Sequence, residues 1–275
     1  MIFGPGHSPL AVRNRPAPGF SLGGPPVLGL SLCYNWPAMP VLRTVAFGIF
    51  YAIFLILLIP VLAVALVLGM RGDIIHIGQW SVRVGCLILG VRVSVSGFER
   101  VDPRAPCIFM ANHLSFLDGP LLAMAVRRTA RIILKKSLFR IPILGLAMRH
   151  VGFVPVDRKG HRGGQRSLRR AARLMREKGW SFLVFPEGTR SRDGKMLPFR
   201  RGGFFLALET GVPIVPVTID GTYELMPKGQ WYSRSGGVRI IFHDPVPVAG
   251  SSPETMPELM ERVRASVASG LARSG

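Results

Sequence analysis

Hydrophobic positions follow one pattern before residue 90 and another after it. Residues 45–69 form an apolar run of 25 residues that contains no charge. A helix of this length, at 1.5 Å per residue, exceeds the hydrocarbon core of a bilayer, which is about 30 Å thick. The run therefore predicts a membrane helix. Pro60 lies inside it and lacks a backbone N–H, so a kinked span and a re-entrant helical hairpin both fit.

The segment after this run is apolar but interrupted. Residues 74–90 include His76, Gln79 and Arg83 among their apolar positions, which favours a second helix lying at the membrane interface. Basic residues occur on both sides of the apolar run, so the charge distribution does not fix its orientation.

The first residues of the chain follow neither a helical nor a strand period. Residues 1–38 are rich in Gly and Pro, which is typical of a disordered tail, and an alternative is that translation starts at Met39. We expect a tail at 1–38, membrane-anchoring helices at 39–90 and a globular domain at 91–275.

Short apolar runs alternate with helical stretches after residue 90. The clearest helical stretch is 165–179, where Leu168 and Met175 belong to an apolar stripe and arginines occupy the other faces. A last helix is expected within 253–273. This alternation predicts an α/β fold with a mixed, largely parallel sheet flanked by helices, and with any antiparallel strands at one end. The expected strands are residues 91–97, 107–113, 131–136, 151–156, 181–188, 212–219 and 238–244.

The charge narrows the class of partner. The chain has 35 Lys and Arg against 15 Asp and Glu, a net charge of +20, together with a positive mean hydropathy of +0.34. This combination suits a membrane protein that faces anionic lipid, although phosphorylated substrates and nucleic acid are polyanions too. Cys33, Cys86 and Cys107 are far apart, so neither a disulfide framework nor a zinc site is predicted.

The sharpest chemical pattern is a histidine followed five residues later by an aspartate. His113 comes directly after an apolar strand, and Asp118 falls in the first turn of the next helix, which Ser115 is expected to cap. A carboxylate there can accept a hydrogen bond from Nδ1–H and stabilise the imidazolium that forms when Nε2 takes a proton. Such a general base suits a hydroxyl that attacks a thioester.

Four sequence blocks give this pair a context. They are NHLSFLD with KKSLFRIPILG, then VPVDR, then FPEGTRS, then VPIVPV, in that order along the chain. Together they resemble the four motif blocks of the glycerolipid acyltransferase family, over residues 91–220. The resemblance implies that residues 91–275 are an acyltransferase catalytic domain.

The resemblance also implies roles for individual residues. The catalytic pair falls on His113 and Asp118, and the proline that shapes the acyl-donor side falls on Pro216. Glu187 belongs to the third block, where it is expected to hold Arg190 or Arg158 in place or to accept a hydrogen bond from the acceptor hydroxyl. The expected binding residues for the substrate phosphate are Lys135, Lys136, Arg158, Glu187, Gly188, Thr189 and Arg190.

The function implied by the resemblance is acyl transfer to the sn-2 hydroxyl of 1-acylglycerol 3-phosphate, which gives phosphatidic acid. Acyl-CoA or acyl-carrier protein is the expected cosubstrate, and no cofactor is expected. Lyso-ornithine lipid and glycerol 3-phosphate are alternative acceptors, because fold and motifs are shared. The expected location is a bacterial inner membrane, with the catalytic domain on the cytoplasmic side and in contact with anionic lipid.

A rival hypothesis rests on the arginine-rich stretch 158–178, which contains an RGG sequence typical of nucleic-acid binding. Its apolar stripe and the membrane segment argue against it, so no nucleic-acid partner is expected. The other histidines have no paired acid and form no metal-ligand spacing, so no metal is expected. A serine nucleophile at Ser115 is disfavoured because no GxSxG motif is present.

Overall fold

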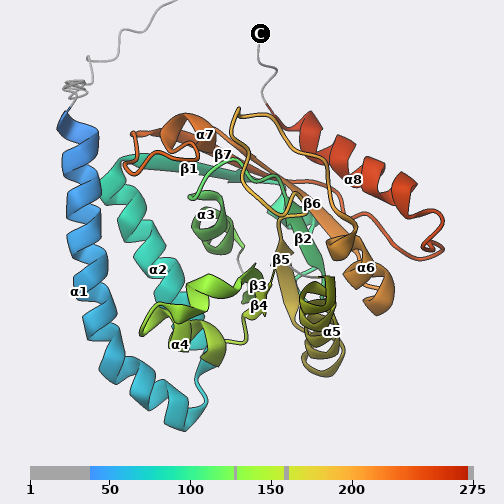
Figure 1. The fold of residues 1–275 in the computed structure, drawn as a ribbon, viewed down its shortest axis with the longest axis horizontal. Coiled ribbons are helices and arrows are strands. Elements are labelled where there is room, and N and C mark those ends of the chain that lie inside the picture. Colours follow the sequence, from blue (N-terminus) through green and yellow to red (C-terminus); the bar gives the residue numbers. More distant parts are fainter. Residues whose placement is uncertain (1–37, 127–128, 158–160, 272–275) are drawn as a thin grey trace, which may run out of the picture. The chain divides into compact units, whose positions relative to one another are not determined.

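The computed structural model describes residues 38–126, 129–157 and 161–271, so the predicted tail lies outside the described residues except for its last position. Two N-terminal helices precede an alternation of strands and helices (Figure 1). The helices are α1 (Ala38–Leu68), α2 (Arg71–Leu89), α3 (Asp118–Ala125), α4 (Leu144–His150), α5 (His161–Lys178), α6 (Arg201–Thr210), α7 (Thr222–Leu225) and α8 (Met256–Ser269). Two 3-10 helices are η1 (Phe98–Arg100) and η2 (Lys136–Arg140). The strands are β1 (Val91–Ser96), β2 (Ile108–Ala111), β3 (Ala130–Lys135), β4 (Val154–Val156), β5 (Ser181–Val184), β6 (Ile214–Asp220) and β7 (Gly236–Phe242).

Seven strands form a single sheet within the described residues, in the order β1-β7-β6-β2-β5-β3-β4. The five strands from β6 to β4 are parallel to one another, β7 is antiparallel to β6, and β1 is parallel to β7. The prediction of a largely parallel sheet with antiparallel strands at one end is confirmed. Each predicted apolar run contains one strand, although β5 ends at Val184 and leaves the next four residues of its predicted run as a loop.

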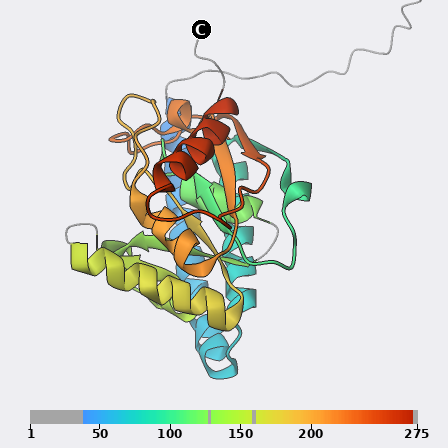
Figure 2. The same ribbon diagram turned by 90° about the vertical axis from the view of Figure 1, so that its right-hand side faces the viewer.

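The two faces of the sheet carry separate hydrophobic clusters, because successive side chains of a strand point to opposite faces. Phe109 and Ala111 of β2 belong to the cluster under α2 and α3, while Ile108 and Met110 join residues of α5, α6 and α8. Figure 2 shows α5, α6 and α8 in front of the sheet and α1 behind it. Every residue of β2 is buried, which explains why this strand reads as a continuous apolar run.

The apolar N-terminal run forms α1, a helix of 31 residues that continues through Pro60. Chain reversal comes at Gly69, whose φ of +71° is a conformation that glycine adopts without strain. The structure therefore has one helix, bent in its second half in Figure 1, rather than two helices that turn at Pro60. The second helix, α2, then packs on α1, α3 and β1.

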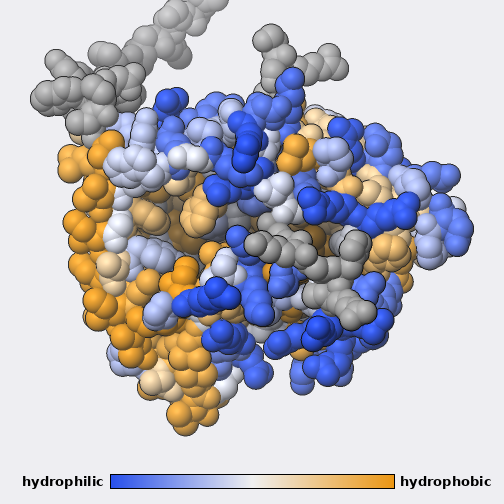
Figure 3. Space-filling model, in the orientation of Figure 1, coloured by the Kyte–Doolittle hydropathy of each residue, from blue (hydrophilic) through white to orange (hydrophobic). Residues whose placement is uncertain are grey.

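The surface of α1 is largely apolar and unburied. Met39–Leu68 is long and apolar enough to cross a membrane, and only 17% of its most apolar window is buried in the protein. A core helix of a soluble protein would be mostly buried, so this exposure favours contact with lipid. Figure 3 shows the orange residues gathered along the side where Figure 1 places α1, and blue residues over α5.

Candidate active site

The carboxyl ends of β2, β5, β6 and β3 meet at one edge of the sheet, which is where α/β folds place their binding sites. Asn112 follows β2 and is fully buried. Its Nδ2 donates to the carbonyl of Ile219 at 2.7 Å, and its Oδ1 accepts from the N–H of Ile219 at 2.8 Å. These two bonds tie the end of β2 to β6, so the backbone at His113 is held in a fixed position.

His113 and Asp118 are in direct contact. Nδ1 of His113 lies 3.0 Å from Oδ2 of Asp118, and the same oxygen accepts hydrogen bonds from the N–H groups of Leu114 and Ser115, each at 2.7 Å. Because Oδ2 acts as an acceptor for these donors, the hydrogen of the imidazole resides on Nδ1. Nε2 is then the ring nitrogen that can take a proton from a substrate.

The other oxygen of the Asp118 carboxylate has a partner that the sequence did not indicate. Thr222, in α7 beyond the end of β6, donates from Oγ1 to Oδ1 of Asp118 at 2.6 Å. Both residues are fully buried. Asp118 therefore accepts from both sides, and its orientation toward His113 is fixed by four donors.

The imidazole ring of His113 lies against Phe185, with ring centroids 4.2 Å apart and an angle of 22° between the planes. The side chain of His113 is 15% exposed. Stacking and the bond to Asp118 hold the ring in one orientation while leaving part of it open to a substrate.

The predicted helix cap at Ser115 is wrong. Helix α3 begins at Asp118 with Leu117 as N-cap and has no side-chain cap. Oγ of Ser115 instead accepts from the N–H of Leu117 at 3.2 Å and donates to the carbonyl of Met226 at 2.8 Å. Ser115 therefore closes a local turn and bonds to the end of α7, instead of capping α3.

Glu187 is buried beneath the loop that carries His113, with 1% of its surface exposed. Its Oε1 accepts from the N–H of His113 at 2.6 Å and its Oε2 accepts from the N–H of Leu197 at 2.9 Å. Burial raises the pKa of Glu187 to about 7, against the lowering effect of these two hydrogen bonds. Glu187 therefore bridges two backbone segments, and among the described residues it has no hydrogen bond or ion pair with Arg190. Its other expected roles, holding Arg158 or accepting from the acceptor hydroxyl, stay predictions, since Arg158 lies outside the described residues.

The rest of the third motif forms a tight loop after β5. Gly188 has a φ of +72°, and a Cβ there would lie 3.1 Å from Cδ and Nε of Arg200. This position therefore favours glycine for both its backbone conformation and its packing. Arg190 places its guanidinium 5.9 Å from the centre of the Phe116 ring, in the loop between His113 and α3.

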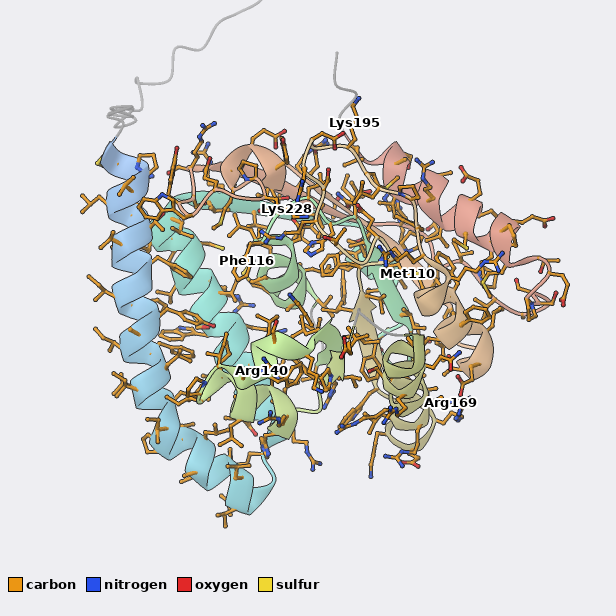
Figure 4. All side chains as sticks on the ribbon, in the orientation of Figure 1. Met110, Phe116, Arg140, Arg169, Lys195 and Lys228 are labelled. Carbon is orange, nitrogen blue, oxygen red and sulfur yellow. The ribbon has the colours of Figure 1, made fainter. Side chains whose placement is uncertain are left out.

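Thr189 and Arg190 share a partner that the sequence did not indicate. Nζ of Lys228 donates to Oγ1 of Thr189 at 3.3 Å and to the carbonyl of Arg190 at 3.1 Å. Figure 4 marks Lys228 and Phe116 in this region, with Lys195 farther out in the loop before α6. Lys228 lies after α7, in the same segment as Thr222, and only a fold that brings residues 222–228 beside His113 reveals either contact.

The remaining predicted binding residues fall at different places. Lys135 ends β3 and Lys136 begins η2, and both are exposed at the carboxyl edge of the sheet. Pro216 lies inside β6, where it is buried and pairs with Met110 of β2, so it shapes the sheet beneath the site. Arg158 lies outside the described residues.

No group of three or more His, Cys, Asp and Glu side chains is placed to hold a metal ion in the part of the chain that the structure describes. The expectation that the reaction uses no metal stays a prediction.

Comparison with known proteins places this geometry in a family. A family model described as Acyltransferase matches residues 92–220, which include both members of the His113–Asp118 pair and all four motif blocks. A chloroplast 1-acyl-sn-glycerol-3-phosphate acyltransferase of Brassica napus is 40% identical over 157 residues, covering 56% of this chain and 45% of the plant protein. The human 1-acyl-sn-glycerol-3-phosphate acyltransferase alpha is 35% identical over 182 residues, covering 66% of this chain and 64% of the human protein.

The chain thus spans about half the length of the plant relatives that it matches. A solved structure agrees over a larger part. The crystal structure of the 1-acyl-sn-glycerophosphate acyltransferase PlsC from Thermotoga maritima superposes with a TM-score of 0.73 at 31% identity, covering 84% of this chain and 94% of that protein. The family match, together with a shared fold at 31% identity over 94% of the Thermotoga protein, shows that this chain belongs to the glycerolipid acyltransferase family.

Proposed function

We propose that this protein is a 1-acylglycerol-3-phosphate O-acyltransferase, which moves a fatty acyl group from a thioester to the sn-2 hydroxyl of 1-acylglycerol 3-phosphate and gives phosphatidic acid. The observation that carries the proposal is the His113–Asp118 pair, with Nδ1 at 3.0 Å from the carboxylate, at the carboxyl edge of the sheet. The names of the plant, human and Thermotoga relatives support the choice of acceptor.

The proposed chemistry needs one general base. Nε2 of His113 takes the proton of the sn-2 hydroxyl as its oxygen attacks the thioester carbonyl carbon. The oxyanion of the tetrahedral intermediate is stabilised by backbone donors or by a basic residue. When the carbon–sulfur bond breaks, the thiolate leaves and accepts the proton from the imidazolium, so His113 returns to its starting state. Asp118 keeps Nδ1 protonated and stabilises the imidazolium throughout.

Recognition of the acceptor rests on the basic residues near this edge. Arg190 can bind a phosphate through two N–H donors, and Lys135 and Lys136 add charge from the end of β3. Arg158 is proposed to join them on the strength of its motif alone. A phosphate on the acceptor therefore suits this site better than the headgroup of lyso-ornithine lipid.

The acyl donor enters this scheme as a cosubstrate. Acyl-CoA and acyl-carrier protein both present the same thioester, and we propose no resident cofactor. Pro216 is proposed to help shape the donor side, since it lies buried in β6 beneath His113.

The apolar surface of α1 favours lateral entry of the acceptor from a membrane. We propose that α1 anchors the protein in a bacterial inner membrane, with the sheet on the cytoplasmic side and the basic residues facing anionic headgroups. An acceptor that already carries one acyl chain reaches the site from the same leaflet.

A panel of acceptors tests the proposal. Membranes that contain this protein are incubated with a labelled fatty acyl group attached either to CoA or to acyl-carrier protein. Each incubation contains one acceptor, which is lysophosphatidate, glycerol 3-phosphate or lyso-ornithine lipid. We expect labelled phosphatidic acid from lysophosphatidate, at a higher kcat/KM than any product of the other two. A dominant product from lyso-ornithine lipid or from glycerol 3-phosphate would replace the proposed acceptor. Membranes with His113→Ala protein serve as the control for host enzymes.

A further inference from the structure

A hollow lies beside the third motif, on the side of the loop that faces the segment after α7. Within the described residues it has a volume of about 480 Å³ and is lined by Thr189, Arg190, Arg192, Asp193, Leu197 and Lys228. Three of these six side chains are cationic and one is anionic. Arg190 and Thr189 belong to the motif expected to bind phosphate, whereas Lys228 follows the last residue that the family model matches.

The carboxylate in this hollow is already engaged. Oδ1 of Asp193 accepts from Oγ of Ser191 at 2.8 Å and from the N–H of Lys195 at 3.1 Å. The hydrogen bond from Ser191 is the main reason that the pKa of Asp193 is lowered. Asp193 stays ionised, so it offsets part of the positive charge, but it does not form an ion pair with Lys228 in this arrangement.

Lys228 is held in place by neutral acceptors. Its Nζ bonds to the hydroxyl of Thr189 and to the carbonyl of Arg190, and no carboxylate neutralises it among the contacts of the described residues. An ammonium group with three donors gains more from an anionic oxygen than from neutral oxygens at 3.1 and 3.3 Å. The ammonium group of Lys228 therefore favours an anionic ligand in this hollow.

Hydrogen bonds connect the segments that line the hollow to the loop that carries the catalytic pair. The N–H of Ser191 donates to the carbonyl of His113 at 3.0 Å, and the hydroxyl of Ser115 donates to the carbonyl of Met226, two residues before Lys228. An anionic group bound between Arg190 and Lys228 would therefore lie next to the loop that carries His113. That position suits a substrate whose hydroxyl reacts at His113 and whose phosphate is a few atoms away.

We propose that Lys228 is a substrate-binding residue that completes a phosphate site with Arg190 and Arg192. This inference rests on the proposed function in taking the ligand to be the phosphomonoester of the acceptor. On binding, Nζ of Lys228 exchanges its bond to Thr189 or to the Arg190 carbonyl for a phosphate oxygen. The shared chemistry is a phosphomonoester, whether it comes from lysophosphatidate or from a soluble phosphate ester.

The test separates binding from turnover by using three variants in detergent micelles. Lys228→Met removes the charge and keeps most of the side-chain volume, while Lys228→Arg keeps the charge. Lys195→Met is the matched control, because Lys195 is an exposed cation of the same loop region that does not line the hollow. Each protein is titrated calorimetrically with glycerol 3-phosphate, and KM and kcat are measured with lysophosphatidate.

We expect Lys228→Met to weaken glycerol 3-phosphate binding and to raise the KM for lysophosphatidate by about tenfold or more, with kcat changed less than about threefold. Lys228→Arg should retain most of the affinity, and Lys195→Met should behave like the wild type. Wild-type protein that binds glycerol 3-phosphate through Lys228 but turns over no lysophosphatidate would support the phosphate site and sink the proposed function.

Two results would overturn the inference. Unchanged phosphate-ester binding in Lys228→Met would show that Lys228 does not contact the ligand. A drop in kcat with unchanged KM and unchanged binding would show that Lys228 only supports the loop at Thr189 and Arg190.

Discussion

The hydroxyl of Thr222 donates a hydrogen bond of 2.6 Å to Oδ1 of Asp118, while Oδ2 of the same carboxylate holds Nδ1 of His113 at 3.0 Å. Thr222 therefore extends the catalytic pair into a chain of three side chains that begins in α7 and ends at the imidazole. Because all donors to Asp118 are fixed by the fold, the carboxylate has a single orientation before any substrate binds.

Replacing Thr222 by valine tests this third link. Thr222→Val keeps the shape and leaves Oδ1 of Asp118 without its donor, so we expect kcat to fall about tenfold. The KM for both substrates should change little, because Thr222 touches neither of them in the proposed scheme. Thr222→Ser retains the donor and should recover most of the activity. Equal losses in the Val and Ser variants would point to packing rather than to the hydrogen bond.

Glu187 gives a prediction about pH. Burial raises its pKa to about 7 from the ordinary value of 4.5, so between these values the folded state holds a proton that the unfolded state has lost. The free energy of unfolding contributed by Glu187 should therefore fall as the pH rises from about 4.5 to about 7, by up to about 3 kcal/mol. Thermal unfolding in detergent at pH 5 and pH 8 measures the effect.

Glu187→Gln is the reference for this measurement, because it does not titrate. The melting temperature of the wild type relative to Glu187→Gln should be higher at pH 5 than at pH 8. The variant should also lose activity at both values, since a glutamine amide can accept from only one of the two N–H groups that Glu187 now bridges. A difference in melting temperature that does not vary with pH would contradict the assignment of a raised pKa.

Arg190 should act on the acceptor rather than on the chemical step. Arg190→Ala removes the guanidinium that is proposed to bind the phosphate, so we expect the apparent KM for lysophosphatidate to rise by about tenfold or more while kcat changes less. Initial rates over a range of lysophosphatidate at saturating acyl-CoA measure this. Arg190→Lys should recover only part of the loss, because lysine cannot bind phosphate through a planar fork. An effect on kcat alone would argue against phosphate binding.

Much of the fold is readable from the sequence because the central strands are buried on both faces. β2 is a continuous apolar run, β5 is apolar after Ser181, and the amphipathic stripe of α5 is equally plain, so these elements follow from the side-chain pattern. The course of the chain at Pro60 was less predictable, since a proline permits both a kinked helix and a turn between two helices. The structure has one helix of 31 residues there, bent in its second half.

In the candidate site, contacts between residues close in sequence were predictable, and contacts between distant residues were not. His113 and Asp118 are five residues apart, so a local motif reveals their pairing. Thr222 is 104 positions from Asp118, and Lys228 is 38 positions from Arg190. Such contacts depend on the pairing of β6 with β2, which brings the segment after β6 close to His113. Glu187 shows a different limit: the sequence identifies the residue but not the direction of its side chain, which points inward to two backbone N–H groups.

The central claim is that His113 is the general base of acyl transfer to a lysophospholipid hydroxyl. The most direct test compares wild type and His113→Ala for the rate of labelled phosphatidic acid formation from lysophosphatidate and acyl-CoA. Membrane content and melting temperature of the variant are checked in the same preparations. We predict a rate loss of about 100-fold or more with both of these unchanged. A folded, membrane-bound His113→Ala protein that retains substantial turnover would contradict the claim.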